Sequence, residues 1–562
     1  MSICHCDKSG ELIWTTNNCH LFKYRNRIDT KPVQLNVTNI GIHLIRSSSS
    51  EHCSSNSTTP SSKFNQCYHF DQIARCTLMT SNNNNNNNDD DDDNDDDDGN
   101  NIGSQGQLQQ REQQQQQKQK RSLLLISCCR PFSSESKLNS SNYNVQLEDN
   151  QVVLEFFVFH RKQSTIGGGG GGGGKIQRKQ VLLLIAKSSN YEENLAEACT
   201  ILDKLDPLIN KGHAIKYSQS KPLLIMMNPA SGERKSVKLF NDHVHQLLDD
   251  CNVKYHVLTT KYANHAMDFI RHHNDLVGSY SAIVTISGDG LLFEVLNGFV
   301  YSLERSTTMP KKISLPISII PGGSGNGLAC SLNNIYTNGG RTMFNKLIES
   351  TLHTIKGQPT PMDLVRITTT TNQIYYSFLS FGWGLMADID IESERLRFLG
   401  EPRFTIWSVY RSLALKRYRG RLSYLHKDSV CQEICPINQP VTDQWTTIND
   451  EFIIVYSAYQ QYLSSTVKFS PDSQLDDEII YLLYINGSVS SCQVIEFLLA
   501  LEDGSHTKLP FVHFIPCKAF RLTPEGHDDI MTIDGEQIPC STIQAEIMPK
   551  AVSILLRNNN GC

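Results

Sequence analysis

Three glycine-containing loops constrain this chain most, because each follows a short apolar run that is typical of a buried strand. The runs are residues 222–227, 282–286 and 315–320. The loops that follow are Asn228-Pro-Ala-Ser-Gly232, Ser287-Gly-Asp-Gly290 and Pro321-Gly-Gly-Ser-Gly-Asn326. Helical patterns over 237–248, 263–273 and 291–300 alternate with these strands and with another at 255–258. Strands and helices that alternate predict an α/β layer with a parallel sheet, in which ligands bind beyond the carboxyl ends of the strands.

The three loops share a chemistry that suits a phosphate chain, because glycine exposes backbone N–H groups without an obstructing Cβ atom. None of them matches the P-loop GxxxxGK[ST] or the dinucleotide fingerprint GxGxxG, since Leu328 stands where the third glycine would fall. This disfavours a Walker-type NTPase and a Rossmann dehydrogenase. One such loop alone is best explained as a tight turn, but three that converge indicate a nucleotide site.

Asp289 is the carboxylate of these loops, and it lies between Gly288 and Gly290 at the end of a predicted strand. Phosphoryl transfer needs alignment, charge neutralisation and a base beside the acceptor hydroxyl. Asp289 is suited to act as that base. The alternative is an aspartate that bonds its own turn.

Low-complexity tracts and changes in pattern divide the 562 residues. Residues 1–215 are predicted to form a β-rich region closed by a helix at 191–209, a small barrel of pleckstrin-homology type. Its inserts at 81–121 and 167–174 hold Asn, Asp, Gln and Gly runs that cannot bury apolar surface and are predicted to be disordered. Its predicted strands are residues 33–45, 123–128, 152–159 and 181–185.

The rest of the chain is predicted to form two domains. Residues 216–361 form the α/β nucleotide-binding domain with a parallel sheet, and residues 362–558 form a mainly β, sandwich-like domain with a loop insertion at 427–447. One long helix, at 404–417, interrupts the strands of the second domain. Its predicted strands are residues 363–367, 375–380, 452–456 and 478–484.

Charge and cysteine content exclude some classes of protein. The net charge of −6 includes nine Asp between Asp89 and Asp98, so the remainder carries about +3, too little to indicate nucleic-acid binding. The 17 Cys are scattered without paired zinc spacing, which favours reduced thiols in a cytoplasmic protein. No apolar run approaches the roughly 20 residues that span a bilayer, so any action on membranes is expected from the surface.

The loop motifs, extended to Gly298 and Ala329, resemble the catalytic module shared by diacylglycerol, ceramide and sphingosine kinases. Three further segments resemble sphingosine kinases closely: Ser380-Phe-Gly-Trp-Gly-Leu-Met-Ala-Asp-Ile-Asp-Ile-Glu-Ser-Glu394, Leu399-Gly-Glu-Pro-Arg-Phe404 and Tyr418-Arg-Gly-Arg-Leu-Ser-Tyr424. Asp534-Gly-Glu536 completes the set. The resemblance covers residues 221–556 without the insertion.

This resemblance implies a role for each matching residue. Asp289 is the base for the lipid hydroxyl, with Ser287, Gly288, Gly290, Ser380 and Asp390 on the substrate side. The nucleotide side comprises Asn228, Pro229, Ala230, Thr260, Glu294, Gly323, Ser324, Gly325, Arg397, Arg403, Asp534, Gly535 and Glu536. ATP is the implied phosphoryl donor, and Mg²⁺ is expected to act through Asp534 and Glu536, since it prefers oxygen ligands and phosphates.

The resemblance also implies a partner for the amine of a sphingoid base, and Asp390 is the first candidate. Asp388 is the second, because alternation by two would place both on one face if this segment is a strand. A solvated acidic edge is the alternative. Residues 403–421 read as a basic amphipathic helix that packs within the lipid domain, with a membrane surface or a calmodulin-like protein as alternative contacts.

The expected function is ATP-dependent phosphorylation of the primary hydroxyl of sphingosine, which gives sphingosine 1-phosphate, at cytoplasmic membrane surfaces. Three alternatives stay open at this point. They are a diacylglycerol or ceramide kinase, a soluble-substrate kinase such as an NAD kinase, and a catalytically inactive lipid-binding scaffold.

Overall fold

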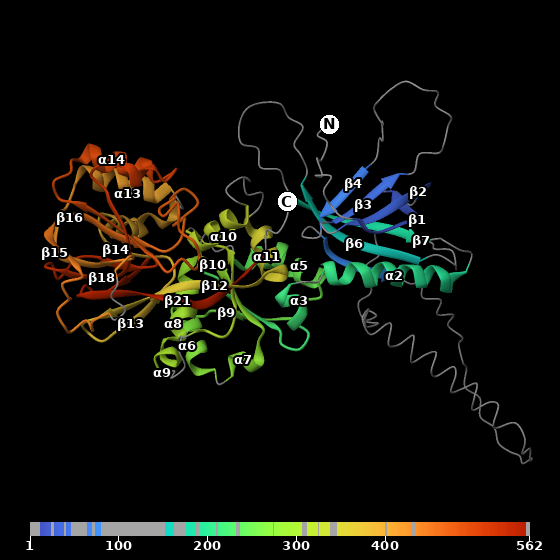
Figure 1. Ribbon diagram of the computed structural model, residues 1–562, viewed down its shortest axis with the longest axis horizontal. Coiled ribbons are helices and arrows are strands. Elements are labelled where there is room, and N and C mark those ends of the chain that lie inside the picture. Colours follow the sequence, from blue (N-terminus) through green and yellow to red (C-terminus); the bar gives the residue numbers. More distant parts are fainter. Residues whose placement is uncertain are drawn as a thin grey trace, which may run out of the picture. The chain divides into compact units, whose positions relative to one another are not determined.

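The computed structural model comprises two compact units, described separately below (Figure 1). In the first unit, the structure describes the backbone of seven strands and of helix α2, and some of the side chains of α2. In the second, residues 212–231, 236–273, 275–305, 312–323, 325–337, 346–399, 402–429 and 434–557 are described, apart from a few side chains.

The first unit contains a seven-stranded sheet followed in sequence by one helix. The strand order is β4-β3-β2-β1-β7-β6-β5, and helix α2 (Tyr191–Ile209) lies against β5. The helix matches the one predicted, whereas the single strand predicted over 33–45 is wrong, because it is the antiparallel pair β2 and β3. The tracts 81–121 and 167–174 and the strand 123–128 lie outside the described residues, and the pleckstrin-homology type stays a prediction. The strands are β1 (Leu12–Lys23), β2 (Arg27–Thr38), β3 (Gly41–Arg46), β4 (Asn65–His69), β5 (Ile73–Met79), β6 (Val152–Arg161) and β7 (Ile176–Ile185).

The second unit begins with the predicted parallel sheet, which is confirmed. Its strands are β8 (Leu223–Met227), β9 (Tyr255–Thr259), β10 (Ala282–Ser287) and β11 (Ile317–Pro321), paired in the order β11-β10-β8-β9. All residues of β8 and β10 are buried, as expected for apolar runs covered on both faces. The helices of this part are α3 (His213–Tyr217), α4 (Ser236–Leu239), η2 (Phe240–Val244), α5 (His245–Asp250), α6 (His265–His272), α7 (Leu276–Ser279), α8 (Asp289–Gly298), α9 (Val300–Arg305), α10 (Gly327–Thr337) and α11 (Lys346–Lys356).

The second part of this unit is mainly antiparallel β structure, again as predicted. Its strands are β12 (Gln358–Thr369), β13 (Ile374–Ser377), β14 (Ser380–Gly384), β15 (Tyr418–His426), β16 (Thr446–Ala458), β17 (Ile480–Asn486), β18 (His513–Pro524), β19 (Met531–Ile533), β20 (Glu536–Ile538) and β21 (Ile543–Leu556). Its helices are α12 (Leu385–Glu392), η3 (Ser393–Leu399), α13 (Pro402–Leu413), α14 (Ser491–Ala500) and η4 (Ser505–Lys508).

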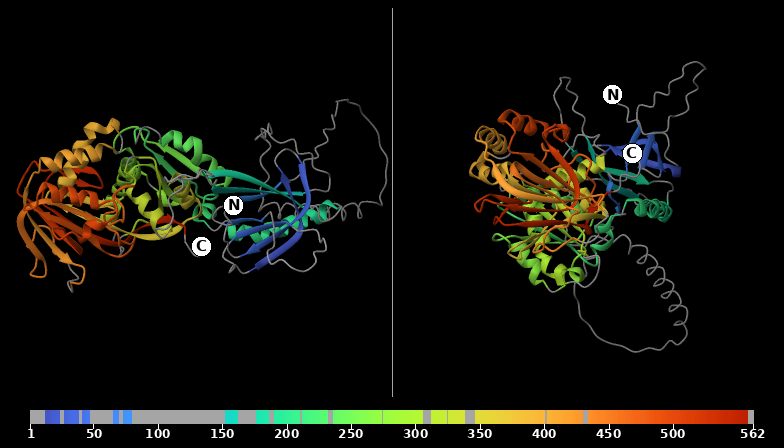
Figure 2. Two further views of the ribbon diagram at one scale, coloured as in Figure 1. Left: turned by 90° about the horizontal axis from the view of Figure 1, so that it is seen from above. Right: turned by 60° about the vertical axis from the view of Figure 1, so that its left-hand side comes forward.

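Two expectations for these helices are corrected. The basic helix predicted to run to residue 421 ends at Leu413, and Arg419 and Arg421 lie on β15, where they pair with β16. Helix α14 was not predicted. Figures 1 and 2 show α13 and α14 (orange) side by side, and the two helices are in contact.

Strand β21 joins the two parts of the second unit. It pairs parallel with β11 at Ile554 and antiparallel with β12 along most of its length. The boundary predicted at Met362 therefore falls inside a strand whose first residues pair with the end of β21. One apolar cluster consequently runs from Leu224 and Ile319 to Phe520. The glycine loops are thus fixed against the β part by shared sheet and shared core.

A second apolar cluster lies beneath α12, α13 and α14 and includes Ile389, Tyr456 and Phe497. Among the helices in the described part of the chain, none combines the length and the apolar character needed to cross a bilayer. Cysteines with described side chains are free thiols.

Candidate active site

The three glycine loops meet at the carboxyl ends of β8, β10 and β11. The Ser231 hydroxyl of the first loop accepts a hydrogen bond from the Gly288 N–H at 3.1 Å. The Gly322 N–H donates to the Ser287 carbonyl at 2.9 Å. A Cβ atom on Gly323 would lie 2.3 Å from the Gly288 Cα atom, so contact between these loops requires glycine. The structure therefore places the loops together, as the parallel sheet predicted.

The first loop is held in shape by its own side chains. Asn228 Oδ1 accepts from the Ala230 N–H at 2.9 Å, and Ser236 Oγ donates to the Asn228 carbonyl at 2.6 Å. Pro229 and Ala230 are exposed at the tip. Thr260 is buried beside this loop, where its N–H donates to the Met227 carbonyl at 2.8 Å. The loop is pre-formed, with its apex available to a ligand.

Asp289 is the first residue of α8 and reaches the start of α10. Its Oδ2 atom accepts from the Gly327 N–H at 2.7 Å, whereas Oδ1 has no partner among the described residues. Burial raises the pKa of this carboxyl to about 6, although the Gly327 and Leu328 amides lower it. A Cβ atom on Gly325 would lie 3.4 Å from Oδ2, so the third loop passes close by. Asp289 is therefore fixed through one oxygen and offers the other.

Glu294, assigned to the nucleotide by resemblance, caps the neighbouring helix. Its Oε2 atom accepts from the Ala266 N–H at 3.1 Å at the start of α6. Burial raises the pKa of Glu294, and the backbone amides at Asn264, Ala266 and Met267 oppose the shift. Its observed contacts hold α6, and its contact with a nucleotide stays a prediction.

Asp534 has both carboxylate oxygens occupied by a single segment of chain. Oδ1 accepts from Ser377 Oγ at 2.6 Å, from the Leu379 N–H at 3.0 Å and from the Ser380 N–H at 2.9 Å, and Oδ2 accepts from the Phe378 N–H at 3.1 Å. Asp534 and Gly535 have φ values of 52° and 86° and form the two-residue turn between β19 and β20. Burial raises the pKa of Asp534 to about 7, against these donors, which lower it. Asp534 is thus placed to organise the site, with three hydrogen bonds to Oδ1 and one to Oδ2.

Glu536 follows this turn and lies against the second glycine loop. A Cβ atom on Gly290 would come within 2.6 Å of Glu536 Oε1. No group of three or more His, Cys, Asp or Glu that could hold a metal occurs among the described residues. Mg²⁺ bound to nucleotides commonly uses one or two carboxylates together with phosphate oxygens. Glu536 fits such a role, and the predicted part of Asp534 in holding Mg²⁺ stays a prediction.

Asp388 and Asp390 lie on helix α12, so the prediction that they share one face of a strand is wrong. Gly384 ends β14 with φ of 90°, where a Cβ atom would lie 2.5 Å from the Ile453 carbonyl oxygen, and α12 begins at the next residue. Helical residues two apart do not face each other. The two aspartates therefore enter different surroundings.

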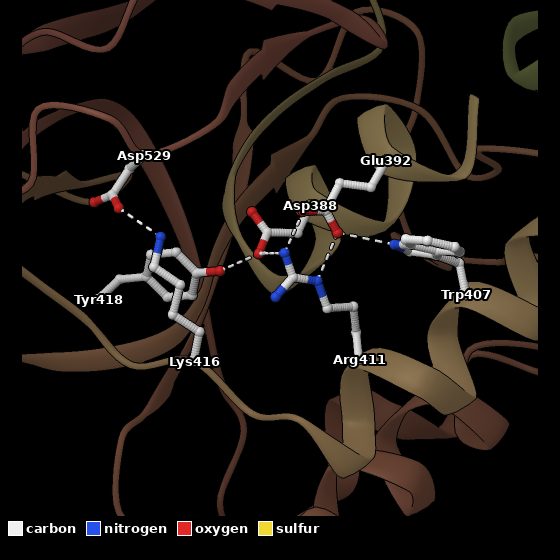
Figure 3. Close-up of polar contacts among 7 residues, drawn as sticks. All are labelled: Asp388, Glu392, Trp407, Arg411, Lys416, Tyr418 and Asp529. Carbon is white, nitrogen blue, oxygen red and sulfur yellow. Dashed lines mark hydrogen bonds and ion pairs between the residues drawn. The ribbon is translucent and has the colours of Figure 1, made fainter. Parts of the chain in front are cut away.

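The Asp388 carboxylate is hydrogen-bonded and ion-paired within the polar network that Figure 3 shows. Its carboxylate accepts from the Tyr418 hydroxyl and pairs with Arg411 at 3.1 Å. Glu392 Oε2 accepts from Arg411 Nε at 2.6 Å and from Trp407 Nε1 at 2.9 Å. The network fastens α12 and α13 to β15, and Asp388 is fully engaged in it.

Asp390 lies on the side of α12 that meets the Asp534–Gly535 turn. Its Oδ2 atom would be 3.5 Å from a Cβ atom on Gly535, and no described residue hydrogen-bonds to its carboxylate. Burial raises its pKa to about 7, the Arg403 charge lowers it, and Glu394 and Glu536 raise it. A carboxylate in this setting lacks the donors that Asp388 and Asp534 have.

Arg403 acts on Asp390 through its charge, and Ser380 is linked to Asp390 through Tyr456, on which the Asp390 charge also acts. Ser380 is buried, and its Oγ atom accepts from the Tyr456 hydroxyl at 3.0 Å. Arg403 is buried, pairs with Glu394, and lies 4.4 Å from the Phe404 ring centre. Ser324 and the Arg397 side chain lie outside the described residues. Sequence reasoning missed Tyr456, because a tyrosine within an apolar strand carries no signal of its own.

Comparison with known proteins gives two family matches. Residues 222–367 match the diacylglycerol kinase catalytic domain, and residues 438–556 match the YegS C-terminal NAD kinase beta sandwich-like domain. Among curated proteins, the chain is 32% identical to sphingosine kinase 1 of Rattus norvegicus over 58% of its own length and 88% of the relative's. The same coverage and identity hold for sphingosine kinase 1 of Homo sapiens. The corresponding protein of Caenorhabditis elegans is 31% identical over 59% of this chain and 80% of its own.

The contacts of Asp534 predict a large effect of replacing its carboxylate. Asp534→Asn removes a charge that accepts four hydrogen bonds and turns an amide NH₂ toward backbone donors. We expect the free energy of unfolding to fall by about 3 kcal/mol. Urea denaturation followed by tryptophan fluorescence measures this, since Trp383, Trp407 and Trp445 all lie in the β part. Asp428→Asn, at an exposed aspartate, is the control and should have almost no effect. Equal stability of both variants would contradict the assigned role.

Proposed function

Because the chain belongs to the sphingosine kinase family, we propose that it transfers the γ-phosphoryl group of ATP to the primary hydroxyl of sphingosine and related sphingoid bases. The observation that carries the substrate assignment is the Asp390 carboxylate, which has no hydrogen-bond donor in the described protein. The observation that carries the chemistry is Asp289, with one free oxygen between the glycine loops.

The reaction follows from the loops and from Asp289. The loop N–H groups at Ala230, Gly288 and Gly322 hold the loops together, and the N–H groups at the start of α8, which have no partner within the helix, bind the phosphate chain. Asp289 Oδ1 accepts the proton of the lipid hydroxyl while the hydroxyl oxygen forms a bond to the γ-phosphorus. The bond from that phosphorus to the bridging oxygen of ADP breaks. The products are ADP and the phosphorylated base. The Gly327 amide keeps the carboxylate in place through Oδ2.

Mg²⁺ and the arginines complete the proposed nucleotide site. Glu536 would hold Mg²⁺, which neutralises phosphate charge when bound. Arg403 offers a guanidinium beside the Glu536–Asp390 region, and its fork suits phosphoryl oxygens once Glu394 is displaced. Asn228, Pro229, Ala230, Thr260 and Glu294 remain proposed nucleotide contacts by family resemblance.

The substrate amine distinguishes this proposal from its alternatives. A sphingoid base carries an ammonium group beside the reacting hydroxyl, and diacylglycerol does not. An ammonium beside apolar walls needs a charged partner, and Asp390 supplies one. Binding would also lower the raised pKa of Asp390, since an opposite charge favours the carboxylate. A neutral head group or a soluble nucleotide substrate would leave this carboxylate unused. An inactive scaffold would have no use for the free oxygen on Asp289.

An exposed apolar stripe on α13 supports action at a membrane surface. Ile406, Val409, Tyr410 and Leu413 are 49, 53, 57 and 72% exposed, and their spacing places them on one helical face. Leu499 on the contacting helix α14 is 73% exposed. Exposed apolar groups gathered in this way are typical of membrane-binding surfaces. A calmodulin-like partner is the alternative, but α13 ends at Leu413 and leaves Arg419 and Arg421 on a strand.

Asp289→Asn tests the chemistry. Loss of a general base is expected to lower kcat by about 10²–10⁴-fold with little change in the KM for ATP. Wild-type kcat/KM should fall as the pH drops, first as Asp390 takes up a proton near its pKa of about 7 and then as Asp289 does below its pKa of about 6. Steady-state rates with sphingosine and radiolabelled ATP across pH measure both. A variant with the wild-type rate would contradict the assigned base.

Asp390→Asn and Asp388→Asn test the amine partner as a matched pair on one helix. Asp390→Asn should raise the KM for sphingosine at least about tenfold, because a charge-assisted bond becomes neutral, and leave the KM for ATP unchanged. Asp388→Asn should instead lower stability by about 1–3 kcal/mol through the Tyr418 and Arg411 contacts. Kinetics and urea denaturation on the same preparations separate the two. The opposite assignment of effects would show that the amine partner is misidentified.

Replacing Val409 and Leu413 together by Ser tests the membrane surface. Burying each side chain is worth about 1.5–3 kcal/mol, so partitioning onto vesicles of phosphatidylcholine and phosphatidylserine should fall more than about tenfold. Activity on sphingosine in detergent micelles should persist. Val277→Ser, at a similarly exposed valine on α7, is the control and should bind like wild type. Unchanged sedimentation with vesicles would exclude α13 as the contact.

A further inference from the structure

Tyr456 joins the polar head-group region to the apolar cluster beneath α12. It lies on β16, directly opposite Gly382 of β14, and its hydroxyl donates to Ser380 Oγ at 3.0 Å. Ser380 precedes Gly382 by two residues, so both point to the face of the sheet on which Tyr456 lies. Tyr456 therefore contacts a predicted substrate residue from the neighbouring strand.

The position of the Tyr456 ring is fixed by its surroundings. A Cβ atom on Gly382 would lie 2.8 Å from the Tyr456 Cε2 atom, so the ring occupies the space that a side chain would take there. The Phe469 ring packs at 5.0 Å between centres. Tyr456 is 8% exposed and belongs to the apolar cluster with Leu385 and Ile389 of α12. This packing directs the Tyr456 hydroxyl toward Ser380.

The contact defines what the Ser380 hydroxyl can do. A serine hydroxyl has one proton to donate and two lone pairs. Tyr456 occupies one lone pair, and no described residue accepts the Ser380 proton. Burial and the Asp390 charge raise the pKa of Tyr456, although the Ser380 hydrogen bond lowers it, so the phenol stays protonated and has a proton to donate. The Asp390 charge and the Ser380 hydroxyl both act on the Tyr456 phenol, so a carboxylate without a described donor and a hydroxyl without a described acceptor lie on either side of it.

An amino alcohol complements this pair of groups, because its ammonium donates and its hydroxyl oxygen accepts. We propose that Tyr456 is a positioning residue for the sphingoid head group, which holds the Ser380 hydroxyl so that its proton is offered to a head-group oxygen. This inference rests on the proposed function and adds to it a residue that acts through Ser380. The same tyrosine marks where the head group ends and the hydrocarbon chain enters the apolar cluster.

Tyr456→Phe tests the proposal, since it removes one hydroxyl and keeps the ring. With sphinganine, KM should rise about 3- to 10-fold, the range expected for one buried hydrogen bond, while kcat changes less than about twofold. The KM for ATP should not change. In a Ser380→Ala background, Tyr456→Phe should add less than about twofold, because its effect passes through the serine.

Tyr459→Phe is the matched control. Tyr459 is also buried, three residues along the chain, and its hydroxyl accepts from Ser457 Oγ at 3.3 Å rather than contacting Ser380. The KM of Tyr459→Phe for sphinganine should equal that of wild type. If wild type is active, three results would overturn this inference alone. They are an unchanged KM in Tyr456→Phe, an equal rise of KM in Tyr459→Phe, and a Tyr456→Phe effect that multiplies with that of Ser380→Ala. A folded wild type without turnover on sphinganine would overturn the proposed function as well.

Discussion

The buried Asp534 carboxylate is the interaction on which the candidate site depends. It accepts from three consecutive backbone amides and from Ser377 Oγ, and its own N–H donates to the Ser380 carbonyl at 2.8 Å. These bonds fix the start of β14 against the β19–β20 turn. Both segments carry functional groups, since Ser380 is the first residue of β14 and Glu536 follows the turn. A single charge thereby sets the relative positions of groups far apart in the sequence.

The sequence predicted the part of the fold that depends on periodicity. Apolar runs with glycine loops at their ends indicated a parallel sheet and the convergence of the loops, because topology alone brings these strand ends together. The closure by β21 was not predicted, since nothing local in residues 543–556 shows that they pair with both β11 and β12. Long-range pairing of this kind is decided by tertiary contacts.

The candidate site was predictable in its residue types more than in its geometry. Alternating acidic and apolar residues from Asp388 to Glu392 suit a strand, but Gly384 turns the chain and a helix follows. The capping role of Glu294 and the four hydrogen bonds of Asp534 depend on partners that are distant in sequence. Tyr456 could be found only from the contact with Ser380. The motifs therefore located the functional residues, while their partners determine what each can do.

Burying the Asp289 carboxylate in the candidate site lowers the stability of the folded protein at neutral pH. Its pKa of about 6, against an ordinary 3.8, corresponds to about 3 kcal/mol of unfavourable free energy for the charged form in the folded protein. A carboxyl whose folded pKa is raised favours the folded state only at low pH, and that contribution disappears as the pH rises through about 6. At neutral pH the protein thus carries a destabilising charge. Asp388, with its hydroxyl and guanidinium donors, shows that the fold can satisfy a carboxylate on the same scaffold. The charges of Asp289 and Asp390 lack comparable support from protein side chains, and in the proposed reaction the lipid hydroxyl and ammonium supply it.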